Sequence, residues 1–256
     1  MQPQKRVIYT FEINNFCVAA YNNGVEEITI TQNGYNGLYM SYLYGKVQQR
    51  FSFLPAICDL KAEGEYTELS FRAERAYCPY VKRFAEENIA DVLAVGYKYS
   101  FFEKRLALPL LSKEEKRLLF TALVAADYKD DKAYAYRRLG GSNRYCLDGV
   151  YHFRLRELKK RWEGIAEYVP SNMNASSLEG FLEFLTEDGD GKLFVKDGKV
   201  YDEEYRLLSR SALTGEESAI AEILLGQAER VYCFGATDEN TVKFLKKYYG
   251  SKAVFC

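Results

Sequence analysis

The spacing of apolar residues changes once along this chain, near Pro79, and that change limits the folds available to it. In the run 68–74, Leu69, Phe71 and Ala73 alternate with polar side chains. A period of two is typical of a strand that is buried on one face. After Pro79 the apolar residues recur every three or four positions, as in amphipathic helices. We therefore expect an α+β fold in which strands come first and helices follow.

Residues 1–76 are predicted to form a β-rich N-terminal region. Apolar residues also alternate over 7–13 and at Ile28 and Ile30. Three Asn-Gly pairs lie between residues 23 and 37, and both residue types tolerate the positive φ of tight hairpin turns. This pattern indicates short antiparallel strands.

Residues 77–173 are predicted to form a central helical bundle of three helices. Ser112 and Glu115 have the spacing of a capping box that opens the second helix, and the glycines at 140–141 should end it. Its buried residues should include Leu119, Leu123 and Ala126. The third helix has the most regular apolar stripe, which consists of Leu155, Leu158, Trp162, Ile165 and Val169.

Residues 174–256 are predicted to form a small C-terminal α/β lobe. The pair 197–198, Asp-Gly, lies between two apolar runs and predicts a β-hairpin. A strand over 230–235, a helix over 238–249 and a strand over 252–256 together predict a right-handed βαβ crossover. Ser176 and Thr214 have the spacing of helix N-caps.

Charge is balanced in the whole chain but not along it. The 256 residues include 35 basic and 36 acidic ones, for a net charge of -1. Such a chain has no global field to attract DNA or an anionic membrane. The three regions have net charges of -1, +5 and -5 from first to last. The basic middle can therefore attract the acidic end or present a basic surface to a partner.

The cysteines and the N-terminus indicate a reduced, cytoplasmic protein. The six cysteines include no C-x-x-C pair, a spacing that suits neither a zinc site nor a redox motif. The first residues are not followed by the apolar stretch of a signal peptide. No run approaches the roughly 18 apolar residues of a membrane span. We expect no metal and no other cofactor.

Two patterns resemble an acid–base or a metal site, but neither has all the residues that such a site needs. His152 is the single histidine, so any histidine-based relay would need it, yet no activated nucleophile lies near it in sequence. A structural or surface role is favoured. The segment 186–197 resembles a calcium loop at Asp188 and Asp190, but its first and last positions lack the expected ligands. A turn is favoured there.

Basic residues of the third helix are the candidate binding residues, namely Arg154, Arg156, Lys160 and Arg161. Basic side chains on a helix can grip phosphates. However, these residues lie off the apolar stripe, as on a solvated helix face, and Glu157 and Glu163 dilute their charge. The solvated face is favoured, and we do not expect a nucleic acid as the partner.

Two further features bear on ligands. The loop 235–238 precedes a predicted helix, where backbone donors favour anions, but Asp238 is expected to cap that helix and displace a phosphate. The chain also has 22 tyrosines, among them Tyr39, Tyr42 and Tyr44. Aromatic side chains fill sheet surfaces, stack on bases or form protein interfaces, and we favour an interface if these tyrosines are exposed.

Several segments resemble a known family when they are taken in order. They are 84–90 (FAEENIA), 112–115 (SKEE), 147–156 (LDGVYHFRLR), 230–235 (RVYCFG) and 253–256 (AVFC). Over residues 80–256 this series is similar to the YtxC-like family of sporulation proteins from spore-forming Firmicutes. The resemblance implies a soluble cytoplasmic protein linked to sporulation. It implies no defined biochemical activity and no site residue.

The sequence thus predicts a non-enzymatic interaction or scaffold protein that binds another protein. Missing catalytic motifs, abundant tyrosine and segregated charge support this interpretation. One alternative is an enzyme or small-ligand-binding protein that uses the C-terminal lobe, where Glu216, Glu217 and Asp238 are dispersed carboxylates. A second alternative is nucleic-acid binding by the basic central helices.

Overall fold

The computed structural model describes residues 7–12, 24–34, 37–51, 56–215 and 217–256 and confirms the α+β fold. The chain divides into two compact units. The N-terminal unit comprises residues 1–94 and 131–159, and the C-terminal unit comprises 95–130 and 160–256. Each unit therefore combines segments that are distant in sequence.

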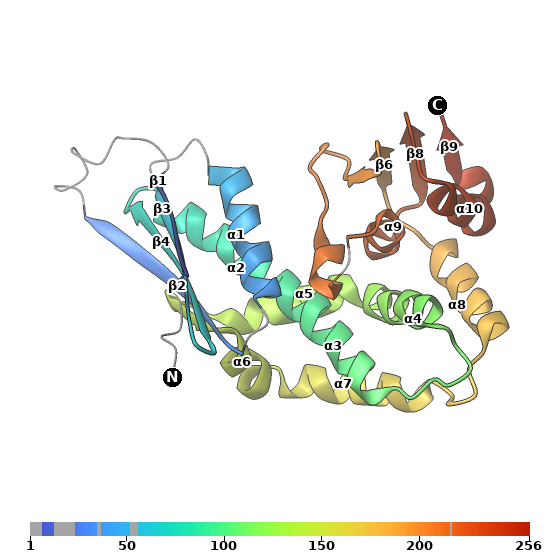
Figure 1. The fold of residues 1–256 in the computed structure, drawn as a ribbon, viewed down its shortest axis with the longest axis horizontal. Helices are drawn as coiled ribbons and strands as arrows, with labels where there is room; N and C mark the ends of the chain where they lie inside the picture. Colours follow the sequence, from blue (N-terminus) through green and yellow to red (C-terminus); the bar gives the residue numbers. More distant parts are fainter. Residues whose placement is uncertain (1–6, 13–23, 35–36, 52–55, 216) are drawn as a thin grey trace. The chain divides into compact units, whose positions relative to one another are not determined.

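A five-stranded sheet forms the centre of the N-terminal unit (Figure 1). Its strands are β1 (Val7–Glu12), β2 (Val25–Asn33), β3 (Ala56–Glu63), β4 (Tyr66–Glu74) and β5 (Arg144–Cys146), in the order β1-β3-β4-β2-β5. The neighbours are antiparallel except for β2 and β5, which are parallel. The predicted β-rich start is confirmed, and β5 adds a strand from much later in the chain.

One face of this sheet packs against the helices α1 (Leu38–Phe51) and α2 (Cys78–Asp91). Alternation sends Ile28, Leu69 and Phe71 into this core, where each is at most 2% exposed. Phe51 at the end of α1 lies edge-on to two rings of α2, with centroids 5.7 Å from Tyr80 and 4.9 Å from Phe84. These contacts fix the two helices to each other and to the sheet.

Helix α1 follows the last Asn-Gly pair and interrupts the region that was predicted to be β-rich. The backbone N–H of Gly34 donates to the carbonyl oxygen of Glu65, so Gly34 leads out of the sheet and not into a two-residue hairpin. The buried residues of α1 follow helical spacing and include Met40, Leu43, Val47 and Phe51. Tyr39 and Tyr42 are also buried and fill the core, so the exposure that would have favoured an interface is not met at these two tyrosines.

The predicted helices after Pro79 are confirmed, with changes at their boundaries. The first continues from α2 through a π-helix, η2 (Val92–Tyr97), into α3 (Lys98–Arg105). The Ser112–Glu115 capping box opens α4 (Lys113–Ala126), with both reciprocal hydrogen bonds formed. The expected single helix to Gly140 is in fact two, because α4 stops at Asp127 and α5 (Tyr128–Leu139) follows. Ala126 is exposed and not buried as predicted.

The third predicted helix is preceded by short elements of the N-terminal unit. These are α6 (Leu147–Gly149) and a second π-helix, η3 (Val150–Arg154). Helix α7 (Arg156–Tyr168) then carries the middle of the predicted stripe: Leu158 and Trp162 are fully buried, as is Leu155 directly before the helix, whereas Ile165 is half-buried. Trp162 packs against Phe101 with their ring centroids 5.8 Å apart.

A four-stranded sheet lies in the C-terminal unit, in the order β7-β6-β8-β9. The strands are β6 (Lys192–Lys196), β7 (Lys199–Tyr201), β8 (Arg230–Phe234) and β9 (Ala253–Phe255). The hairpin between β6 and β7 turns at Asp197 and Gly198, which both have positive φ, as an Asp-Gly turn of type I′ requires. Strands β6, β8 and β9 are parallel, so the predicted strand–helix–strand unit of β8, a helix and β9 is confirmed, while its right-handed sense stays a prediction.

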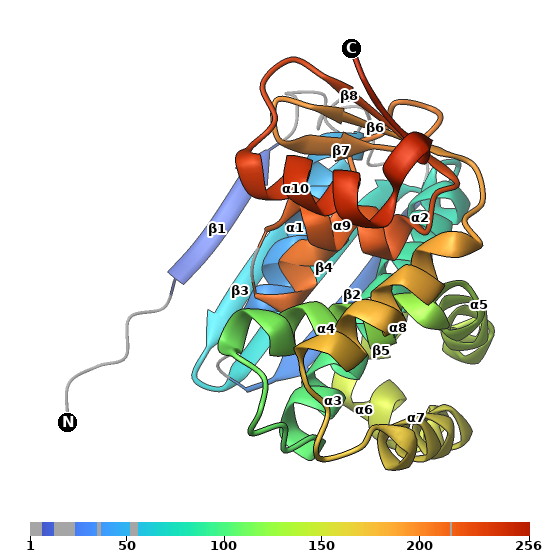
Figure 2. The same ribbon diagram turned by 90° about the vertical axis from the view of Figure 1, so that its right-hand side faces the viewer.

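The helices that follow α7 in the chain lie on one side of this sheet (Figure 2). They are α8 (Ala175–Glu187), η4 (Arg210–Thr214), α9 (Ala219–Gly226), α10 (Glu239–Tyr248) and η5 (Gly250–Lys252). Leu193, Val195 and Val231 are buried beneath them. The N-caps of α8 and α9 are Asn174 and Ser218. The predicted caps Ser176 and Thr214 lie inside α8 and η4, because an N-cap needs an extended backbone.

Candidate functional site

The predicted binding residue Arg154 supports a helix end. Its guanidinium donates to the carbonyl oxygens of Arg138, at 3.2 Å, and Leu139, at 2.7 Å. These carbonyls belong to the last turn of α5, which has no intrahelical donors left for them. A cation at this position also interacts favourably with the negative end of the helix dipole. Arg154 therefore has a local structural role.

The other three candidates, Arg156, Lys160 and Arg161, are exposed on α7. The buried stripe of Leu158 and Trp162 occupies the opposite side of this helix. Ligand binding by these three side chains stays a prediction.

The residues considered for acid–base or metal chemistry take up separate positions. His152 is exposed on η3, with its ring 4.9 Å from that of Tyr151. Asp238 caps α10 by accepting from the backbone N–H of Thr241, and this hydrogen bonding lowers the pKa of its carboxyl. Glu217 is exposed, and Glu216 lies outside the described residues.

The segment that resembles a calcium loop has a structural explanation. The Thr186 hydroxyl is buried and donates to the carbonyl oxygens of Leu182 and Tyr248. Gly189 lies so close to the carbonyl of Ala228 that a Cβ atom there would be only 2.2 Å from its oxygen. Across the ranges that the structure describes, no group of three or more His, Cys, Asp or Glu residues could hold a metal ion.

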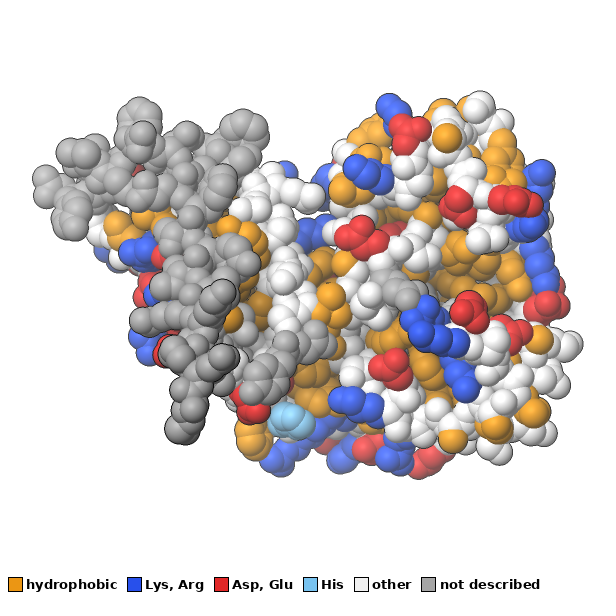
Figure 3. All heavy atoms as spheres, in the orientation of Figure 1, with side chains coloured by type: hydrophobic (Ala, Val, Ile, Leu, Met, Phe, Trp, Pro, Cys, Tyr) orange, Lys and Arg blue, Asp and Glu red, His pale blue; other side chains and the backbone are white. Residues whose placement is uncertain are grey.

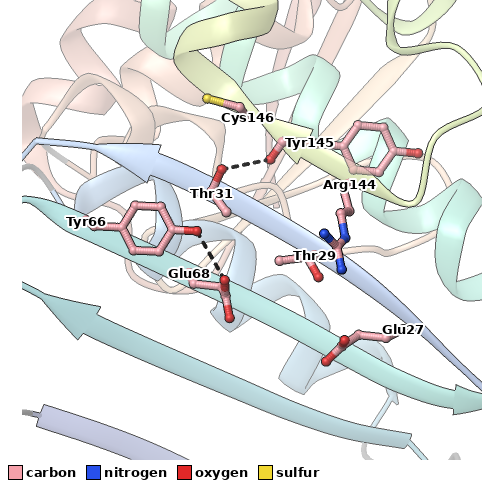
Figure 4. Close-up of a pocket in the computed structure, with 8 residues that line it drawn as sticks. All are labelled: Glu27, Thr29, Thr31, Tyr66, Glu68, Arg144, Tyr145 and Cys146. Atoms are coloured by element: carbon pink, nitrogen blue, oxygen red, sulfur yellow. Dashed lines mark hydrogen bonds between the residues drawn. The ribbon is translucent and has the colours of Figure 1, made fainter.

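A polar pocket of about 380 Å³ lies on the β2, β4 and β5 strands of the N-terminal unit (Figure 4). Its lining residues are Glu27, Thr29, Thr31, Tyr66, Glu68, Arg144, Tyr145 and Cys146. The hydroxyl of Thr31 donates to the backbone carbonyl of Tyr145, at 3.4 Å, and that of Tyr66 donates to Glu68, at 3.1 Å. The pocket thus offers hydroxyl groups, two carboxylates and one guanidinium to a small polar group.

Only part of the pocket lining could be predicted from the sequence. Glu27, Thr29 and Thr31 alternate with Ile28 and Ile30, so the polar face of β2 follows from the sequence. The neighbouring β5 is 114 residues away, as the Thr31–Tyr145 hydrogen bond shows. The ring of Tyr145 points away from the pocket, and its hydroxyl donates to Glu86 at 2.6 Å. Burial is the main cause that raises the pKa of Tyr145, and the hydrogen bond to the Glu86 carboxylate raises it further, so the hydroxyl stays protonated.

The uncovered side of the C-terminal sheet carries a cluster of aromatic rings, which we call the aromatic face: Phe194, Tyr201, Tyr205, Tyr232 and Phe234. Phe194 is at its centre, with centroids 4.6 Å from Tyr205, 5.6 Å from Tyr232 and 6.3 Å from Phe234. The planes of these rings lie within 27° of that of Phe194. Strand alternation explains the arrangement, since Leu193, Val195 and Val231 point to the helices.

Tyr205 is the outermost ring of this face and is 68% exposed. Its backbone has a φ of 56°, a left-handed conformation that costs a residue with a Cβ about 1–2 kcal/mol. Asp202 holds the loop, because its carboxylate accepts from the backbone N–H groups of Glu204 and Arg206. The Arg206 guanidinium closes it with a 2.7 Å bond to the same carboxylate. The loop therefore presents Tyr205 over Phe194 in a defined position.

Basic residues share the aromatic face. Lys192 and Lys196 flank Phe194 at alternate positions, and Lys199 pairs across from Lys196. Arg230 precedes Tyr232 in the same way on β8. All four are exposed, and the four described strands contain no Asp or Glu. In the view of Figure 3, basic and hydrophobic side chains are interspersed with acidic ones at the surface of the C-terminal unit.

Comparisons with known proteins add no information about function. No protein-family model, curated protein or solved structure matches the chain. Within the described ranges, each helix is too short or too polar to cross a membrane.

Proposed function

We propose that this protein acts by binding, as an interaction or scaffold protein, and that the aromatic face is its binding surface. The observation that supports this proposal is Tyr205, an exposed ring on a strained backbone that a network around Asp202 keeps in place. Backbone strain of this kind costs stability and is concentrated at functional sites. Exposed tyrosines in a fixed position are typical anchors of binding interfaces.

Site-specific photo-crosslinking in cells tests this proposal. Tyr205 is replaced by the photoreactive residue p-benzoyl-phenylalanine, and Tyr168, which is 90% exposed on α7, is replaced in the matched control. We expect a discrete crosslinked species from position 205 and none, or a diffuse background, from position 168. Equal labelling at both positions, or none at either, would contradict the proposal.

A role in sporulation is also part of this proposal, and the resemblance of residues 80–256 to the YtxC-like family supports it. Deletion of the gene in a spore-forming host should lower the number of heat-resistant spores, and expression of the wild-type protein should restore it. A Tyr205→Asn variant should not restore it, whereas Tyr168→Asn should. An unchanged spore count in the deletion strain would refute this part.

A second candidate function is the binding of a small polar ligand in the pocket of Figure 4. The observation that favours it is the placement of the Arg144 guanidinium among hydroxyl groups and the carboxylates of Glu27 and Glu68. Such a mixture suits a zwitterion or a small anion. Thermal denaturation with amino acids and inorganic anions should show stabilisation that Arg144→Gln removes and Arg156→Gln retains. Equal responses from both variants would exclude the pocket.

A further inference from the structure

We infer that the aromatic face binds single-stranded nucleic acid, an inference that rests on the proposed function. It specifies the class of partner for that surface. Four observations support it: the charge of the strands, the orientation of the rings, the exposure of Tyr205, and the poor suitability of the face for a second copy of the chain.

Charge is the first observation. The strands carry Lys192, Lys196, Lys199 and Arg230 and no carboxylate, although residues 174–256 have a net charge of -5. The acidic residues lie at the strand ends, and most have a cationic neighbour. Asp202 and Glu204 pair with Arg206, Asp190 with Lys129, and Glu229 lies 3.9 Å from Arg230, while Asp197 and Glu203 are in turns. The strands thus form a basic surface within an acidic region.

The dimensions of the face suit a phosphate backbone that runs beside the bases. Lys192 and Lys196 are four residues apart on one strand, which is about 13 Å at the usual rise per residue. Phe194 lies between them. Cations on either side of this position can contact phosphates of one strand while the exposed ring of Tyr205, which is stacked on Phe194, contacts a base, the combination that proteins use for single strands.

Ring orientation is the second observation. The ring of Tyr205 is nearly parallel to that of Phe194, at 14°, and Tyr205 is exposed. Parallel rings at a surface form a platform on which a flat base can stack, and every base has such a flat surface. Bases within a duplex are already stacked on each other and are not available in this way. The face therefore suits a single strand and not a double helix.

The same charges argue against a second copy of this chain. A two-fold dimer through the aromatic face would place the four cations of one copy against the same four of the other. Like charges across an interface are unfavourable, and lysine is depleted from interface cores. A partner with regularly spaced negative charge and flat apolar groups avoids both problems.

This inference differs from the expectation drawn from the sequence, which did not favour nucleic acid. That expectation concerned the basic residues of α7 and the net charge of the whole chain. The aromatic face combines residues of β6, β7, β8 and the 202–206 loop, and their alignment depends on the sheet order. The aromatic face does not include α7, and its strands are basic although the whole chain has a net charge close to zero.

Fluorescence anisotropy with labelled 12-nucleotide strands tests the inference on the full-length protein. Oligo-dT and oligo-U distinguish DNA from RNA, and a 12-base-pair duplex serves as the competing probe. We expect binding of a single strand with a log–log salt slope of about -3, because each of four phosphate contacts contributes about -0.7. Affinity should therefore fall about 50-fold between 50 and 200 mM salt.

Matched variants locate the binding surface. Tyr205→Asn removes the ring, and asparagine tolerates positive φ, so the loop should keep its shape. We expect affinity to fall about fivefold or more, while Tyr168→Asn leaves it unchanged. The double variant Lys192→Gln/Lys196→Gln should reduce the salt slope by about 1.4, and Lys104→Gln/Lys113→Gln, at exposed lysines of the same unit, should not.

Each outcome bears on the inference or on the proposal beneath it. Absence of single-strand binding, stronger binding of the duplex, or equal losses in the matched variants would overturn the inference. If the crosslinked species from position 205 keeps its size after nuclease treatment and contains peptides of a second protein by mass spectrometry, the interaction function stands and the nucleic-acid inference fails. If position 205 gives no species and no strand binds, both fail.

Discussion

The two sheets of this protein share a plan but present different surfaces. In each sheet one face is packed against helices, with Leu69 and Leu193 as examples of its buried residues. The other face of the N-terminal sheet carries hydroxyl groups and charges around the pocket of Figure 4, whereas that of the C-terminal sheet carries aromatic rings and lysines. Polar side chains at a surface form hydrogen bonds to water. Exposed aromatic rings leave apolar surface in contact with water, and burying that surface would be favourable by about 25 cal/mol per Å². The comparison teaches that the covered faces stabilise both units, while the C-terminal uncovered face is the one that gains most from a partner.

The largest expected effect tests whether the faces are assigned correctly. Leu193→Ala and Leu69→Ala should each lower the free energy of unfolding by about 2–4 kcal/mol, because each leaves a cavity in a closed core. Lys192→Ala and Glu68→Ala, their neighbours on the other faces, should each change it by less than about 1 kcal/mol. Urea denaturation followed by circular dichroism measures all four. Similar losses for the two members of a pair would show that its sheet has no uncovered face.

The second effect concerns the ion pair of Asp59 and Arg72 in the N-terminal sheet. On its polar face the Asp59 side chain is 7% exposed and lies 2.5 Å from the Arg72 guanidinium. Arg72→Met should therefore cost about 2 kcal/mol, since it leaves a buried carboxylate without its cation, while the exposure of Arg72 limits the loss. The double variant Asp59→Ala/Arg72→Met should lose less than the single one in the same urea experiment. A larger loss in the double variant would mean that Asp59 is stabilised by other groups.

A smaller effect separates a structural arginine from a surface one. Arg154→Ala should cost about 1 kcal/mol, because the carbonyls at the end of α5 lose their donor. Arg156→Ala, two residues along and exposed, should stay within about 0.5 kcal/mol of the wild type. Thermal unfolding by calorimetry gives both values. If Arg154→Ala is neutral, the helix-end role assigned to it is wrong.

The smallest effect is a pH dependence in the C-terminal unit. Hydrogen bonds from Thr241 lower the pKa of Asp238 in the folded state, so its contribution to stability is complete above the ordinary aspartate pKa of about 4. It is lost as the pH falls from there through the lowered folded-state value. Asp238→Asn keeps a capping side chain but does not titrate. The wild type should be more stable than this variant at pH 6 by less than about 1 kcal/mol, and the difference should vanish or reverse in sign near pH 2. A difference independent of pH in urea denaturation would contradict this role.

Local signals predicted much of the fold. The alternation at Leu69, Phe71 and Ala73 gave a strand, and the Asp197-Gly198 pair gave a hairpin, because both depend on neighbouring residues only. The Ser112–Glu115 capping box is also confirmed, since its two hydrogen bonds close within four residues.

Helix α1 shows where such signals failed. Its tyrosines favour strands and the Asn-Gly pairs before it favour tight turns, so local propensity pointed to a β-rich region. The stripe of Met40, Leu43 and Val47 has helical spacing, and burial of that stripe against the sheet outweighs the propensity of single residues. The strength of this packing depends on the sheet beneath it.

By itself, then, the sequence determined the β-rich start and the helices after Pro79, the buried face of strands such as β4, and the helix starts capped by Ser112 and Asp238, because these follow from spacing along the chain. The tertiary structure decided that β5 joins β2 across more than a hundred residues and that Tyr205 lies over Phe194. It also decided that Arg154 supports the end of α5. Both candidate surfaces arise from these long-range neighbours, whose positions depend on the simultaneous packing of the core and not on any short segment.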